Sequence, residues 1–115
     1  PGQFPGWLAL VATPVLMMAL SVVGIHPVVT STALLATFSG GGADVHPALL
    51  VQAHLIGWGA GTMSSIASLS VLTCAGLYQV PARRLVLGHN MASGFAYAAG
   101  CGGLLVLANF ALGHV

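Results

Sequence analysis

Formal charge is nearly missing from this sequence. Asp44, Arg83 and Arg84 are the only charged residues among 115, which is 3% of the chain, whereas a typical soluble domain carries about 25%. A soluble fold of this composition would have almost no polar side chains to cover its surface. Two neighbouring arginines also cannot form the clustered basic surface that binding to nucleic-acid phosphates needs. We therefore expect neither a water-soluble domain nor a nucleic-acid partner.

Residues that carry out catalysis are equally scarce. Asp44 is the single side-chain carboxylate, so the chain has no carboxylate pair and no buried acid for a proton relay. There is no nucleophile–base pattern and no phosphate-binding loop. Cys74 and Cys101 form no CxxC motif and lie in apolar sequence, as small buried side chains often do. The sequence predicts no enzyme, no metal site and no resident cofactor.

The chain consists instead of apolar sequence rich in glycine. Hydrophobic residues make up 57% of it, the mean hydropathy is +1.01, and 16 residues are glycine, which lets transmembrane helices approach closely. These features predict an all-α polytopic membrane protein in the lipid bilayer, forming a single membrane domain over 1–115. Its apolar segments cover about 7–23, 28–38, 47–80 and 85–112. The sequence starts without a methionine or a basic leader, and we expect a fragment of a larger permease.

Two of these segments have lengths that do not match one straight crossing. Segment 28–38 is short against the roughly 20 residues of a span, and it is either a steep crossing or one arm of a re-entrant hairpin. Segment 47–80 would be about 51 Å long as one helix, against a hydrocarbon core of about 30 Å. It must tilt strongly, cross twice or be broken. Its glycine- and serine-rich run predicts a break near 61–70.

A break of this kind is a candidate binding site. Unwound backbone is tolerated in a membrane where it is buried in protein or lines a cavity. Half-helices that meet there direct amides toward anions and leave carbonyl oxygens for cations. The alternative is an unbroken small-residue interface whose hydroxyls bond to their own helix. The predicted substrate- or ion-binding residues of the break are Gly61, Thr62, Ser64, Ser65, Ser68 and Ser70. A second group, from the hairpin arm, is Thr30, Ser31 and Thr32.

The five histidines offer a different interpretation. His54 and His89 lie in or near apolar helices and could ligate haem from facing helices, as in a b-type cytochrome subunit. His26 and His46 each precede a proline, a position typical of a helix start, where histidine often caps. His114 is near the chain end. A haem-binding membrane subunit is therefore an alternative function.

A series of short motifs resembles a known family. Gly-Ile-His-Pro-Val-Val at 24–29 is followed by Gly-Trp-Gly at 57–59, a serine-rich break, Gly-Leu-Tyr at 76–78 and a short basic turn before Asn90. This order is similar to the C-terminal part of ion transporter superfamily permeases, which include divalent anion/sodium symporters and arsenite permeases. The resemblance implies a hairpin, a broken helix and a closing helix, with the broken-helix loop at 63–70.

The same resemblance implies a function. It predicts part of a secondary active transporter for an organic or inorganic anion, coupled to Na⁺ or H⁺, that works by elevator-type alternating access. The rest of the site would come from the remaining half of the permease, and a homodimer is a candidate assembly. The positive-inside rule places the turn at Arg83 and Arg84 on the cytoplasmic side of a bacterial inner membrane. The last alternative, a structural or assembly subunit without a ligand, predicts a continuous helix over 64–70.

Overall fold

The computed structural model describes residues 4–66 and 68–114. Within these ranges the regular structure is helical, apart from one isolated bridge between Phe4 and Ala43, and the all-α prediction is confirmed there. The described helices are α1 (Gly6–Val22), α2 (Pro27–Phe38), α3 (Pro47–Ser64), α4 (Leu69–Tyr78), α5 (Ala82–Val86) and α6 (His89–Ala111).

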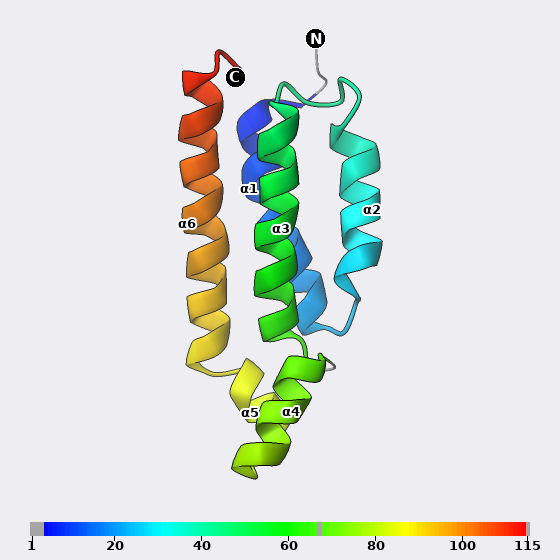
Figure 1. Cartoon of the computed structure of the whole chain (residues 1–115), viewed down its shortest axis with the longest axis vertical. Coiled ribbons are helices and arrows are strands. Elements are labelled where there is room, and N and C mark those ends of the chain that lie inside the picture. The colour runs from blue at the N-terminus through cyan, green and yellow to red at the C-terminus, as the bar shows by residue number, and fades with distance from the viewer. Residues whose placement is uncertain (1–3, 67, 115) are drawn as a thin grey trace.

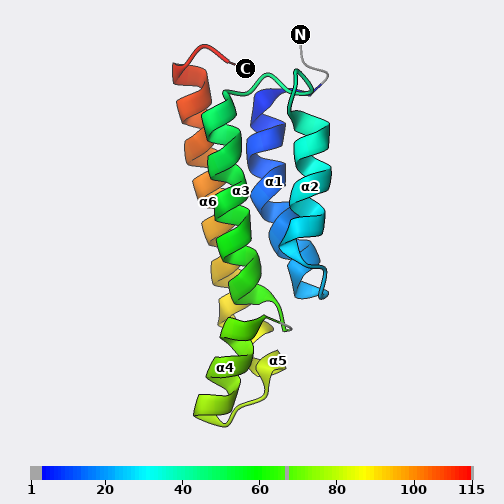
Figure 2. The ribbon, with the colours of Figure 1, turned by 45° about the vertical axis from the view of Figure 1, so that its right-hand side comes forward.

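The helices form an elongated bundle with extents of 51 × 23 × 17 Å. α1 and α3 run side by side in the same direction, α6 packs against both, and α2 lies at the edge of the bundle against α1 (Figures 1 and 2). The described residues nearest the two termini lie at one end of the bundle. α4 and α5 extend beyond the other end, where α3 ends and α6 begins (Figure 1).

Histidine followed by proline starts two of the helices. The Nδ1 atom of His26 accepts a hydrogen bond from the N–H of Val28 at 3.1 Å, and that of His46 accepts one from Ala48 at 3.3 Å. In both helices the proline occupies the first position, where its missing N–H costs nothing. The predicted capping role of these two histidines is confirmed.

Glycine allows α1 and α3 to pack with their backbones close together. A Cβ atom on Gly57 would lie 2.7 Å from the sulfur of Met17 and 3.0 Å from Cα of Pro14, and one on Gly61 would lie 2.6 Å from the Ser21 hydroxyl. A side chain at Gly57 would press on the backbone of α1, and one at Gly61 would displace the Ser21 side chain. The interface is therefore formed by small residues, as membrane helix packing favours.

A polar network closes the end of the bundle near the termini. Asn109 of α6 is 1% exposed. Its Oδ1 accepts a hydrogen bond from the N–H of His46 at 3.0 Å, and its Nδ2 donates one to the carbonyl of Asp44 at 3.1 Å. Nδ1 of His114 lies 2.8 Å from Oδ1 of Asp44. α6 is thus joined to the loop between α2 and α3.

Two helical stretches are long and apolar enough to cross a membrane. They are 47–78, with 32 residues counted across the junction of α3 and α4, and 90–111, with 22 residues. α1 and α2 are shorter apolar helices, of 17 and 12 residues.

The expected single helix over 85–112 differs from the structure. Arg83 and Arg84, expected in a turn, lie in the short helix α5, which follows Pro81. Leu87 and Gly88 then separate α5 from α6. Gly88 has φ −111° and ψ −138°, a conformation outside the helical region, so the long helix begins only after it. Apolar composition gave no sign of this turn.

Candidate functional site

Serines mark the place where α3 stops and α4 starts. α3 ends at Ser64, and Ser65 has extended backbone angles, φ −88° and ψ 128°. Ser68 precedes α4, and its hydroxyl accepts a hydrogen bond from the N–H of Val71 at 3.2 Å. This is a standard N-cap. The interruption therefore spans 65–68 and falls inside the range 61–70 that the sequence indicates; Ala67 lies outside the described residues.

Four of the six hydroxyl and glycine residues predicted at the break line one hollow of about 310 Å³. The turn between α1 and α2 forms its opposite wall, and Gly24 in that turn has a φ of +96°, which glycine adopts readily. The full lining is Gly24, His26, Pro27, Thr62, Ser65, Ser68, Leu69 and Ser70. We call this space the serine hollow.

Serine and threonine form part of the largely apolar lining of the serine hollow, and no lining residue carries a formal charge. The hydroxyl of Thr62 donates to the carbonyl of Gly59 at 3.0 Å. The Ser68 hydroxyl accepts from Val71, so its own proton can be donated elsewhere. The first N–H groups of α4, at Leu69 and Ser70, are not used in intrahelical bonds. An anion at this helix start would also be favoured by the helix dipole.

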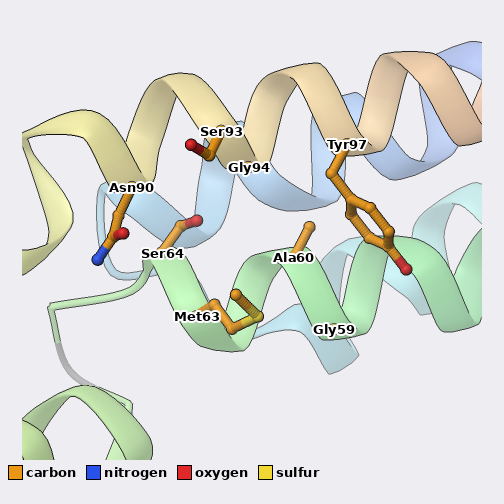
Figure 3. A pocket seen from close by; sticks show the side chains of 8 residues that line it. All are labelled: Gly59, Ala60, Met63, Ser64, Asn90, Ser93, Gly94 and Tyr97. Carbon is orange, nitrogen blue, oxygen red and sulfur yellow. The ribbon is translucent and has the colours of Figure 1, made fainter.

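The other two predicted residues of the break lie elsewhere. Gly61 is buried against Ser21 and serves packing. Ser64 is 1% exposed and lines a second hollow of about 320 Å³ between α3 and α6 (Figure 3). That hollow is also lined by Gly59, Ala60, Met63, Asn90, Ser93, Gly94 and Tyr97.

The hairpin-arm residues Thr30, Ser31 and Thr32 do not line the serine hollow. Thr30 is 5% exposed and its Oγ1 has no hydrogen-bond partner among the described residues. The Ser31 hydroxyl lies 2.9 Å from Nδ1 of His54. Thr32 donates to the carbonyl of Val28, in its own helix, at 2.8 Å. The structure therefore separates the two predicted groups of site residues.

The wall formed by His26 and Pro27 was not predicted as part of the site. The sequence marked His26 only as a helix start, although Gly24 to Val29 was the most distinctive of the family-like motifs. The ring of His26 meets that of Trp58 edge to face, with centroids 5.8 Å apart. A signal existed in Gly24, two residues before His26, because a turn with positive φ there redirects the chain.

For the proposed haem ligands, the structure describes one side chain. His54 is 8% exposed and lies at the interface of α2 and α3, in contact with Ser31. His89 opens α6, but its side chain is outside what the structure describes. Within the described residues there is no group of three or more His, Cys, Asp or Glu side chains that could hold a metal ion.

The chain was also compared with known proteins. No protein-family model matches it, and no curated protein or solved structure is significantly similar to it.

Proposed function

We propose that this chain is a membrane-embedded part of a secondary active transporter and that its serine hollow binds the transported anion. The observation that carries this proposal is the interruption between α3 and α4. There a long apolar helix stops and restarts, and Ser65 and Ser68 line a hollow together with the start of α4.

A membrane setting is supported by the surface of the bundle. Large apolar side chains in the middle of the long helices are exposed, among them Leu55 at 62%, Leu104 at 67% and Leu107 at 66%. Only three residues carry formal charge. Exposed apolar patches of this extent are unfavourable in water, whereas lipid or further protein can cover them.

The local chemistry favours an anionic substrate. The start of α4 presents backbone N–H groups and the positive end of its dipole, and the Ser68 hydroxyl, which accepts from Val71, can donate a hydrogen bond. The carbonyl groups at the end of α3 suit a metal cation, so a coupling Na⁺ fits the same region, whereas a coupling H⁺ needs a titratable side chain. The alternative function, a structural subunit without a ligand, predicts a continuous helix over 64–70. The interruption between α3 and α4 favours the transporter over this alternative.

The proposal extends to the whole permease. The remaining half of the site would come from other parts of the transporter, which moves by elevator-type alternating access and can assemble as a homodimer. We place the chain in a bacterial inner membrane with Arg83 and Arg84 on the cytoplasmic side.

Substitution of the serines tests the site. We expect Ser65→Leu and Ser68→Leu, each made in the full-length transporter, to abolish uptake of the anions it carries, because a leucine side chain fills the hollow and removes a hydroxyl. Uptake of radiolabelled succinate and sulfate into expressing cells measures this.

Ser39→Leu is the matched control, since Ser39 follows α2 at the opposite end of the bundle. It should leave uptake unchanged, and membrane expression of all three variants should equal that of the parent. Undiminished uptake in both hollow variants would show that the interruption is not the binding site.

A further inference from the structure

One histidine ring is enclosed between helices, away from the serine hollow. His54 of α3 is 8% exposed, and its Nδ1 lies 2.9 Å from the hydroxyl of Ser31 in α2. Its Nε2 is buried and has no hydrogen-bond partner among the described residues. One nitrogen of the ring is therefore held, and the other is enclosed without a partner.

Helix packing shows which part of α1 lies at the level of His54. Gly57, one turn further along α3, packs against Pro14 and Met17 of α1. Because α1 and α3 run in the same direction, the residues of α1 at the level of His54 lie about one turn before Met17. Thr13, which is fully buried, is in that turn.

Two buried hydroxyls share this level. Thr13 is 0% exposed, and Thr30, the neighbour of Ser31, is 5% exposed. The Oγ1 atoms of both are buried and have no partner in the part of the chain that the structure describes. Most buried polar groups in proteins are hydrogen-bonded. These three atoms, one each from α1, α2 and α3, are exceptions to that rule inside the bundle.

Hydroxyl groups suit a ring that gains and loses a proton. A hydroxyl can donate one hydrogen bond and accept others. Ser31 can thus donate to Nδ1 when that nitrogen is unprotonated and accept from it when it is protonated. The Ser31 hydroxyl can therefore bond Nδ1 in either protonation state of the ring.

Few other groups near this histidine can titrate. α1 (Gly6–Val22) and α2 (Pro27–Phe38) carry no titratable side chain, and α3 carries none besides this histidine. α6, which packs against α1 and α3, brings Tyr97, Cys101 and the opening His89. None of these helices contains a carboxylate, so a proton bound here adds a positive charge that no acid compensates. Intramembrane ionisable residues commonly mark proton pathways.

We propose that His54 is a proton-binding site inside the bundle and that the ion coupled to transport is the proton held there. The proton adds to one ring nitrogen, whose lone pair forms the new N–H bond, and leaves by the reverse step. Ser31 is four residues, about 6 Å along α2, from Pro27, which lines the serine hollow. The hydroxyl that contacts His54 thus belongs to the helix whose first residue lines the serine hollow.

Nuclear magnetic resonance of the ring nitrogens tests proton binding directly. The chain, labelled with nitrogen-15 at histidine, is placed in phosphatidylcholine nanodiscs and titrated from about pH 5 to about pH 8, the range in which histidine ordinarily changes charge. The His54 signal is identified by its loss in His54→Gln or, should that variant not fold, by its contact with Ser31 in the native chain. We expect this ring to titrate. A ring that keeps one protonation state throughout, while other histidines titrate, overturns the proposal.

Ser31→Ala tests whether the hydroxyl that contacts His54, and not burial of the ring alone, sets the titration midpoint of this histidine. It should move the titration midpoint of His54 by about half a pH unit or more. Thr37→Ala, also in α2, removes a hydroxyl that donates to its own helix at the Ala33 carbonyl, 2.8 Å away, and should leave that midpoint unchanged. Equal shifts in the two variants would refute the role of Ser31.

The coupling role rests on the proposed transport function, but the two can fail separately. If His54 titrates while Ser65→Leu and Ser68→Leu leave uptake unchanged, the serine hollow is refuted and the proton site stands. If the hollow variants abolish uptake while uptake is independent of a pH gradient, transport stands and proton coupling through His54 is refuted.

Discussion

Asn109 joins parts of the chain that are distant in sequence. Its buried amide bonds the N–H of His46 and the carbonyl of Asp44. Asn109→Ala would remove two partly buried hydrogen bonds, each worth about 0.5–1.5 kcal/mol, or about 1–3 kcal/mol together. We expect a loss of free energy of unfolding in that range, measured by circular dichroism during detergent-induced unfolding.

Asn90 provides the comparison within the same helix. Its side chain is exposed and donates to the carbonyl of Leu85 at 2.8 Å. Asn90→Ala should therefore change the free energy of unfolding by less than about 1 kcal/mol, since water replaces the lost bond. A larger effect for Asn90 than for Asn109 would contradict the role given to the closed end of the bundle.

The pairing of α1 with α3 depends on glycine at particular positions. A methyl group on Gly57 would meet Met17 and Pro14, whereas one on Gly59 would meet nothing within 4 Å. We expect Gly57→Ala to destabilise the bundle by about 1–3 kcal/mol, because a tight interface must open. Gly59→Ala should be neutral or stabilising by up to about 1 kcal/mol, since alanine favours helix.

Thermal unfolding of the two glycine variants, followed by circular dichroism in the same detergent, gives the comparison. Equal melting temperatures would mean that α1 and α3 do not pack through Gly57.

The interruption of the long apolar helix was predictable, but the direction of its hydroxyls was not. A bilayer sets a limit on helix length, and serine and glycine identified where the helix stops. Which side Ser64 faces depends on the rotation of α3, which is set by the contact of Gly57 and Gly61 with α1. That contact joins segments about 40 residues apart in sequence, and single-sequence patterns do not contain it.

The hydroxyl run in α2 shows a related limit. Thr30, Ser31 and Thr32 are consecutive, so on a helix they point in directions about 100° apart. The structure accordingly finds one buried, one bonded to His54 and one bonded to its own helix. A run of polar residues predicts a shared site on a loop, but not on a helix.

For the chain as a whole, the membrane proposal predicts opposite exposure of its two ends. Arg84 in α5 and Ser39 after α2 lie at opposite ends of the bundle. In a background without Cys74 and Cys101, we expect Arg84→Cys to react with an impermeant maleimide in inverted vesicles but not in intact cells. Ser39→Cys should show the reverse. Reaction of both from the same side would refute a crossing between them.

Hydrogen bonds join several elements at the end of the bundle near the termini. The N–H of Phe4 donates to the Gly42 carbonyl at 3.0 Å and that of Asp44 donates to Phe4 at 3.2 Å, next to the contacts of Asn109. A tilt of any helix about this end displaces each of its residues in proportion to the distance from the end. Over the 18 residues of α3, about 27 Å, a tilt of about 10° carries the far end through about 5 Å. The serine hollow lies at that far end, where a small angular change gives the widest opening.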